Sequence, residues 1–223
     1  MNLLDQRLLA EGLGTALLLA TVVGSGVMGV ALADGNDAVA LLANAGATAG
    51  MLYVLITILG PISGAHFNPA VTLVMAMRGE IGARQAAAYV SVQLLGALAG
   101  VVLAHAMFDL DLLQPGTRVR TGASQWLSEG VATFGLLLTV LIGAKHRAAA
   151  LPALVAAYIF AAYWFTSSTS FANPAVTVAR GFTQTFAGIR LQDVLGFVLA
   201  QGAGVIAAVA IARALGVKEP RPT

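Results

Sequence analysis

His66-Phe67-Asn68-Pro69-Ala70-Val71-Thr72 and Phe171-Ala172-Asn173-Pro174-Ala175-Val176-Thr177 share five residues in a row, Asn-Pro-Ala-Val-Thr. The two asparagines, Asn68 and Asn173, are 105 positions apart, so that each half of the chain holds one copy. Asn followed by Pro is typical of a helix start, because Asn caps the first turn and Pro fits the first helical position. Two such starts at corresponding places indicate a pore built from two half-helices.

The composition is that of an integral membrane protein. Hydrophobic residues make up 58% of the chain and charged residues only 10%, whereas soluble domains carry about a quarter charged residues. The 223 residues are ample for six membrane helices, each of about 20 residues. With no Cys and three scattered His residues, we expect no metal site and no cofactor. The sequence has no stripe of basic residues, so we expect no nucleic-acid partner. The hydrophobic composition predicts a lipid bilayer as the surroundings.

Six long apolar runs predict an all-α membrane protein with six transmembrane helices. Two further segments, at about 62–78 and 168–186, are too short to cross the membrane and contain the repeated motif. Irregular backbone at membrane depth is tolerated only where it is buried in protein or lines a wet cavity. We therefore expect two re-entrant loops, each followed by a half-helix. The expected spans are about 8–32, 38–60, 83–107, 124–144, 150–167 and 192–214.

The two halves also match outside this motif. Residues 11–15 in the first span resemble residues 129–133 in the fourth, and each stretch begins with a Glu followed by Gly. Residues 1–223 are thus predicted to form one channel domain, with repeat 1 at about 8–108 and repeat 2 at about 124–214. Because three spans per repeat is an odd number, the second copy is inverted and the two loops meet near the midplane.

The basic residues predict the orientation in the membrane. With both termini inside, eight of the twelve Lys and Arg residues fall in inner segments and four in outer segments. The positive-inside rule therefore favours cytoplasmic termini. The inner residues are Arg7, Arg78, Arg84, Lys145, Arg147, Arg213, Lys218 and Arg221, and the outer ones are Arg118, Arg120, Arg180 and Arg190.

Two Asn-Pro-Ala motifs on this inverted plan resemble the aquaporin, or major intrinsic protein, family. Residues 64–72, Gly-Ala-His-Phe-Asn-Pro-Ala-Val-Thr, fit the first signature of that family closely. The likeness covers about residues 8–214. It implies passive conduction of small uncharged molecules through each protomer of a homotetramer. For this chain we expect a bacterial inner membrane as the location.

The pore motifs are expected to meet at the centre of the channel. Asn68 and Asn173 are predicted to cap their half-helices and to offer side-chain N–H donors to the lumen. Both helix N-termini carry partial positive charge, which opposes cations. The expected motif residues are Asn68, Pro69, Ala70, Asn173, Pro174 and Ala175. Further lining is expected from the backbone carbonyls of Gly64, Ala65, His66, Phe67, Thr169, Ser170 and Phe171.

One departure from the family pattern bears on selectivity. In most members an Arg directly follows the second Asn-Pro-Ala, but this chain has Val176 there. By family spacing, the other filter positions are Thr48, Ala161 and Ser170. None of the four is bulky or charged, so the constriction is predicted to be wide and mildly polar. The resemblance therefore favours the bacterial aquaglyceroporins, including the branch linked to arsenic resistance. The expected solutes are glycerol, small polyols, metalloid acids such as arsenite, and water.

Arg180 lies four residues after Val176 on the same half-helix. That spacing gives about 6 Å of rise and nearly one turn, so both residues share roughly one face. Arg180 can therefore supply a guanidinium at the outer mouth. In the alternative interpretation, it extends to the membrane interface or pairs with an acid.

Acidic residues inside membrane spans have two interpretations. Glu11 and Glu129 either support the re-entrant loops by accepting backbone N–H bonds or form a proton relay. The relay corresponds to an alternative function, an ion- or proton-coupled secondary transporter of the inverted-repeat type. Their symmetry favours loop support. An enzyme is not expected, because no nucleophile or acid–base pair is apparent.

Overall fold

The computed structural model describes residues 3–217, and every regular element in that range is a helix. Six are long and apolar enough to cross a membrane, which confirms the all-α fold class, and their ends differ from the expected ones by five residues at most. The chain is a multi-pass membrane protein. The spans are α1 (Leu3–Leu32), α2 (Asp37–Ser63), α4 (Ala83–Met107), α5 (Ala123–His146), η1 (Ala148–Ala150) continued by α6 (Leu151–Phe165), and α8 (Leu191–Ala214).

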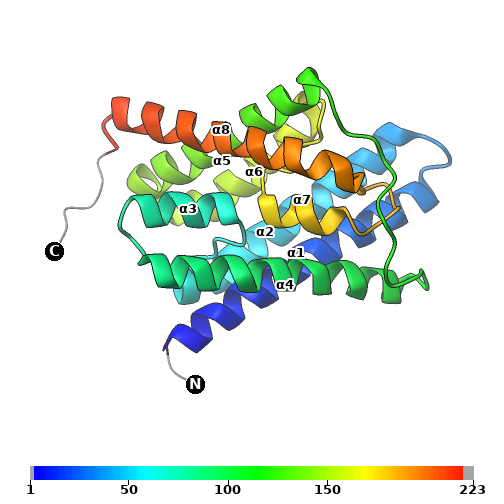
Figure 1. Cartoon of the computed structure of the whole chain (residues 1–223), viewed down its shortest axis with the longest axis horizontal. Coiled ribbons are helices and arrows are strands. Elements are labelled where there is room, and N and C mark those ends of the chain that lie inside the picture. Colours follow the sequence, from blue (N-terminus) through cyan, green and yellow to red (C-terminus); the bar gives the residue numbers. More distant parts are fainter. Residues whose placement is uncertain (1–2, 218–223) are drawn as a thin grey trace.

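The two half-helices are α3 (Pro69–Met77) and α7 (Pro174–Arg180), and they lie end to end in the middle of the molecule (Figure 1). Each lies within the segment that was predicted to hold a re-entrant loop followed by a half-helix, 62–78 and 168–186. The residues before each Asn are not helical, because backbone φ is positive at three residues of each loop, namely Gly64, Ala65 and Phe67, then Thr169, Ser170 and Ala172.

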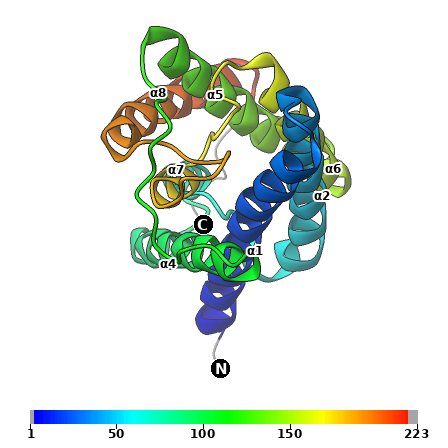
Figure 2. The same cartoon turned by 90° about the vertical axis from the view of Figure 1, so that its right-hand side faces the viewer.

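The six spans form a ring around the half-helices (Figure 2). α1 packs against α2 and α4, α5 packs against α6 and α8, and α2 joins the two halves by packing against α6. Both α3 and α7 pack against α4 and α8 inside this ring. α1 begins and α8 ends at the same end of the molecule (Figure 1). The half-helices thus lie between α4 and α8, and α3 keeps an exposed face on which Leu73 is 50% exposed.

Two glycine pairs allow the closest helix contacts, one in each half. A Cβ atom at Gly96 of α4 would collide with the backbone oxygen of Gly12 on α1, and one at Gly204 of α8 would collide with that of Gly130 on α5. Small residues let membrane helices approach closely and gain van der Waals contact. These pairs set the distance between the helices that enclose each half-helix.

We predict that Gly96→Ala lowers the stability of the protein, because α1 and α4 must move apart to admit the new methyl group. Overpacking of this kind costs about 1–3 kcal/mol. Thermal unfolding of detergent-solubilised protein, followed by size-exclusion recovery, measures the effect. Gly202→Ala is the matched control, since a Cβ at Gly202 on α8 meets no atom within 4 Å. Equal unfolding temperatures for the two variants would contradict the prediction.

Candidate functional site

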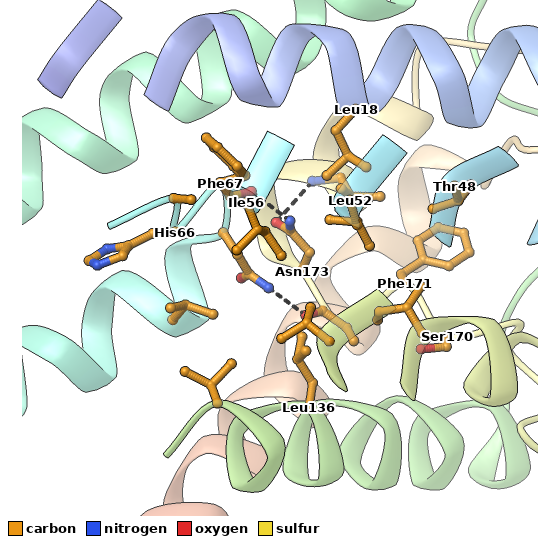
Figure 3. A pocket seen from close by; sticks show the side chains of 18 of the residues that line it. Leu18, Thr48, Leu52, Ile56, His66, Phe67, Leu136, Ser170, Phe171 and Asn173 are labelled. Carbon is orange, nitrogen blue, oxygen red and sulfur yellow. Dashed lines mark hydrogen bonds between the residues drawn. The ribbon is translucent and has the colours of Figure 1, made fainter. Parts of the chain in front are cut away.

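A single cavity of about 250 Å³ follows the axis of the two half-helices and is lined from Met75 and Glu80 at one end to Arg180 at the other. Figure 3 shows His66 towards one end of this cavity and Thr48, Ser170 and Phe171 at the opposite end. Most of its lining is apolar, with polar groups supplied mainly by the two loops. A cavity of mixed polarity inside a membrane protein is suited to hold small molecules.

Asn68 and Asn173 lock the two loops to each other at the centre of this cavity. Asn68 Oδ1 accepts the N–H of Ala70 at 2.8 Å, while its Nδ2 donates to the backbone oxygen of Ala172 at 2.8 Å. Asn173 caps α7 in the same way and donates from Nδ2 to the backbone oxygen of Phe67 at 2.8 Å. One N–H of each amide is therefore bound to the opposite loop. Each amide has one further N–H, and both residues line the cavity.

Glu11 holds the first loop from inside α1, where its side chain is fully buried. Its Oε1 accepts hydrogen bonds from the backbone N–H of His66 at 2.9 Å and from Ser63 Oγ at 2.7 Å. Its Oε2 accepts from the N–H of Phe67 at 2.7 Å and from Gln93 Nε2 at 2.8 Å. Four donors thus compensate the burial of one carboxylate.

Glu129 holds the second loop in the same manner from α5. Its Oε1 accepts from the N–H of Phe171 at 2.8 Å and from Ser168 Oγ at 2.6 Å. Its Oε2 accepts from the N–H of Ala172 at 2.9 Å and from Gln201 Nε2 at 2.6 Å. Both loops are therefore fixed by the same set of four donors, which is the geometry that loop support requires.

The loops contribute all but one of the expected lining residues. The cavity is lined by residues 64–67 of the first loop and by Ser170 and Phe171 of the second. Thr169 does not line it, and its Oγ1 instead lies 3.4 Å from Arg120 Nη1. His66 lines the cavity with its Nδ1 3.1 Å from Thr72 Oγ1.

Three of the four expected filter residues lie together, and the fourth does not. Thr48, Ser170 and Val176 line the outer end of the cavity and are buried. Ala161 was predicted beside them but lies on the exposed face of α6 and does not line the cavity. Tyr163 takes this place, and its hydroxyl lies 3.4 Å from Thr48 Oγ1. A shift of two residues turns a helix by about 200°, which explains why the expected residue faces outward.

Arg180 also lines the outer end of the cavity and is only 2% exposed. Its Nε donates to the backbone oxygen of Ala187, and its guanidinium carbon lies 3.4 Å from the ring centroid of Phe171. Arg180 makes no salt bridge within residues 3–217. The alternative in which Arg180 pairs with an acid is therefore wrong, and its burial also speaks against extension to the interface.

A second buried guanidinium supports the same ring. Arg120, in the loop between α4 and α5, lies 5.0 Å from the centroid of Phe171. It donates to the backbone oxygens of Gly188 at 2.9 Å and Ser168 at 3.0 Å. Burial, and then the positive charge of Arg180, lower the pKa of Arg120 well below its usual value. Two guanidiniums thus converge on one aromatic ring at the outer mouth.

No group of three or more His, Cys, Asp or Glu side chains that could hold a metal ion occurs within residues 3–217. The lining of the cavity consists of the two loops, neutral polar groups and apolar side chains, with Glu80 at one end and Arg180 at the other.

The family model for the major intrinsic proteins matches residues 2–167 of this chain. The chain belongs to the major intrinsic protein family. Aquaglyceroporin AqpS of Rhizobium meliloti (strain 1021) is 58% identical over 210 residues, covering 94% of this chain and 90% of that protein. A probable glycerol uptake facilitator protein of Thermotoga maritima is 31% identical over 170 residues, covering 68% of this chain and 70% of that protein.

The fold has a counterpart among solved structures. The X-ray structure of the aquaglyceroporin from Plasmodium falciparum superposes with a TM-score of 0.72 and covers 94% of both chains, at 17% sequence identity. That likeness concerns the fold alone. The family match makes this major intrinsic protein a member of a family of channels rather than of enzymes.

Sequence reasoning missed the role of several residues in this major intrinsic protein. Gln93 and Gln201 each bridge a buried Glu to a Thr hydroxyl of the adjacent half-helix, Thr72 at 2.9 Å and Thr177 at 2.8 Å. Their matching positions in the two repeats were the available signal. Nothing in the sequence indicated that Arg120 would reach back across the outer mouth.

We predict that Glu11→Gln and Glu129→Gln each destabilise the protein. The amide replaces one acceptor oxygen with an NH2 group that faces loop donors, and each buried donor left unsatisfied costs about 1–3 kcal/mol. Thermal unfolding in detergent and folded yield measure the effect. Asp111→Asn is the control, because residue 111 is exposed in the loop after α4. Unchanged stability in both Gln variants would refute loop support.

Proposed function

We propose that this protein is a passive channel for small neutral solutes, namely glycerol, small polyols, metalloid acids such as arsenite, and water. The cavity lined by both half-helix loops carries the proposal, since its lining includes Met75 and Glu80 on one side of the two Asn residues and Arg180 on the other. The Rhizobium meliloti and Thermotoga maritima relatives, an aquaglyceroporin and a probable glycerol uptake facilitator, support glycerol as a solute.

The outer end of the cavity favours solutes larger than water. Val176 occupies the position after Asn-Pro-Ala and offers neither bulk nor charge. Thr48, Ser170 and Val176 form the selectivity filter in this proposal, with Tyr163 in the place expected for Ala161. Hydroxyl groups on one side and an apolar Val on the other suit a solute that has both C–H and O–H groups.

A coupled transporter fits the same residues less well. Such proteins need a site whose charge changes during the cycle, and Glu11 and Glu129 are the acids within the spans near the loops. Each already accepts four hydrogen bonds. Protonation of either carboxylate would break contacts that hold a loop. Proton transfer through these groups would therefore disrupt the structure of the pore.

In this proposal the N-termini of the two half-helices and the side chain of Arg180 exclude ions. The N-termini of α3 and α7 direct partial positive charge at its centre, where both capping Asn residues lie. Arg180 adds a full positive charge at the outer mouth. A guanidinium remains protonated at any working pH, so this charge opposes cations throughout the physiological range.

The assembly and the cellular setting complete the proposal. The two repeats, about 8–108 and 124–214, act as one channel domain, and four such chains form a homotetramer. The channel lies in a bacterial inner membrane with cytoplasmic termini, in keeping with the excess of Lys and Arg in the segments assigned to the inside.

Purified protein in proteoliposomes tests this function directly. Stopped-flow light scattering should show reswelling driven by glycerol well above that of empty vesicles, with a flux that rises linearly with concentration and is insensitive to an uncoupler. Water permeation without uptake of glycerol or any metalloid acid would refute the solute channel. Saturable flux that collapses with the proton gradient would favour the transporter.

We predict that Val176→Arg reduces glycerol flux much more than water flux. The substitution adds a long cationic side chain to a residue that is 5% exposed and lines the cavity. Water still passes a constriction that excludes a three-carbon solute. The same light-scattering assay measures both fluxes, and Val176→Leu controls for added volume without charge. Equal loss of both fluxes in correctly assembled protein would indicate simple blockage.

A further inference from the structure

The cavity along the two half-helices, the pore cavity, meets a second cavity of about 530 Å³ at the end opposite Arg180. We call this second cavity the inner vestibule. Three residues line both cavities, namely Met75, Glu80 and Ala144. Met75 and Ala144 are apolar, so Glu80 is the polar residue where the two cavities meet. A solute that moves between the inner vestibule and the pore cavity therefore passes its carboxylate.

A defined turn at the end of α3 places Glu80 at this point. The N–H of Glu80 donates to the backbone oxygen of Met75 at 2.9 Å. The N–H of Gly79 donates to the backbone oxygen of Ala76 at 3.0 Å, and Gly79 has a φ of +74°, which glycine adopts without strain. This pair of bonds is the Schellman motif that ends many helices. Glu80 is therefore fixed to the half-helix that Asn68 caps.

The carboxylate of Glu80 is bound on one side only. Its Oε1 accepts a hydrogen bond from Arg78 Nε at 2.6 Å, while its Oε2 accepts none within residues 3–217. The side chain of Glu80 is 38% exposed, so its carboxylate is not sealed inside the protein. Arg78 lines the inner vestibule but not the pore cavity, whereas Glu80 lines both. The pair therefore presents its acceptor end to the pore cavity.

Acceptors are scarce elsewhere in this half of the pore cavity. The first re-entrant loop, residues 64–67, contributes polar groups near the centre. The walls that α2, α5 and α6 contribute are apolar here, with Ile56, Val140 and Leu151 in the lining. A solute hydroxyl that gives up water without gaining a new partner pays a desolvation penalty. An acceptor at the inner end lowers this penalty for a molecule that enters or leaves.

The charges around Glu80 favour an uncharged donor as its partner. Arg78 already offsets the attraction of the carboxylate for a cation. The other cationic side chain that lines the inner vestibule, Lys145, donates from Nζ to the backbone oxygen of Gly216 at 2.6 Å and does not line the pore cavity. An anion is disfavoured by the carboxylate itself. A neutral O–H group is the donor that fits Oε2.

We propose that Glu80 forms an inner solute site of this channel, in which Oε2 accepts a hydrogen bond from an O–H group of a neutral polyhydroxy solute. Arg78 is its positioning residue. This inference rests on the proposed function and adds a residue that favours polyols at the end opposite the filter. Water depends less on the site, because neighbouring waters supply its hydrogen bonds, whereas the carbon chain of a polyol displaces them.

The test compares glycerol permeability with water permeability in proteoliposomes of the full chain. We expect Glu80→Leu to lower the glycerol-to-water ratio about fivefold, the factor of one hydrogen bond of typical net strength. Glu80→Gln retains an acceptor oxygen without the charge and should give a smaller decrease. Every permeating molecule passes residue 80 whichever way the protein is inserted, so mixed orientation does not obscure the effect.

The role of Arg78 is tested in two backgrounds. In the parent, Arg78→Ala should lower the same ratio, because Glu80 loses the contact that orients it, and Arg78→Lys should restore part of the loss. In the Glu80→Leu background, Arg78→Ala should change the ratio no further, since residues that act through one contact are not additive. A merely structural Arg78 would instead lower the ratio or the folded yield equally in both backgrounds.

Asp111→Asn is the matched control, because Asp111 is an exposed acid that lines neither cavity. Its ratio should equal that of the parent. If the parent conducts glycerol and both Glu80 variants keep the parent ratio, the inner site is overturned while the channel function stands. An unchanged ratio with a new nitrate flux would also overturn it and would make Glu80 a barrier to anions. A parent that conducts no solute overturns both proposals.

Discussion

The reciprocal bonds from Asn68 and Asn173 to the opposite loop are the constraint on which the rest of this structure depends. Two half-helices that meet by their N-termini bring like partial charges together and leave the first backbone N–H groups of each without helical partners. Each Asn caps its own helix with one atom and binds the other half of the molecule with another. Each Asn thus satisfies groups of both loops at the pore centre, where the dipoles of the two half-helices face each other.

This arrangement requires rigid loops, and the buried carboxylates supply the rigidity. Positive φ at five non-glycine residues costs about 1–2 kcal/mol each, so neither loop would hold its shape alone. Glu11 and Glu129 each organise two successive N–H groups of such a loop. The Gly12–Gly96 and Gly130–Gly204 contacts then bring the helices that carry Glu and Gln close enough for each Gln to donate to the Glu and to a Thr of the half-helix. The strained loops therefore depend on the buried carboxylates, and the carboxylates depend on close packing of the helices that carry them.

The sequence alone was sufficient for features that repeat and insufficient for those that do not. Six spans, two half-helices and the paired Glu residues all leave a signal twice, once in each half. The outer mouth has no such duplicate. Ala161 was misplaced because the family spacing does not fix the rotation of α6, and two residues of error moved the prediction to the opposite face. Arg120 comes from an irregular loop with no periodic pattern, so its approach to Phe171 depends on tertiary packing that no local rule describes.

The outer mouth separates two properties that a single Arg after the second motif would combine. Val176 itself offers neither charge nor bulk, while one helical turn further along α7 the cavity has a buried guanidinium. Repulsion of cations falls off slowly over a few ångströms in a low-dielectric channel, whereas steric exclusion acts only at the level of contact. A displacement of about 6 Å therefore preserves the electrostatic barrier and relaxes the size limit. The same displacement brings the guanidinium onto the ring of Phe171, so that an aromatic surface lies directly against the charge.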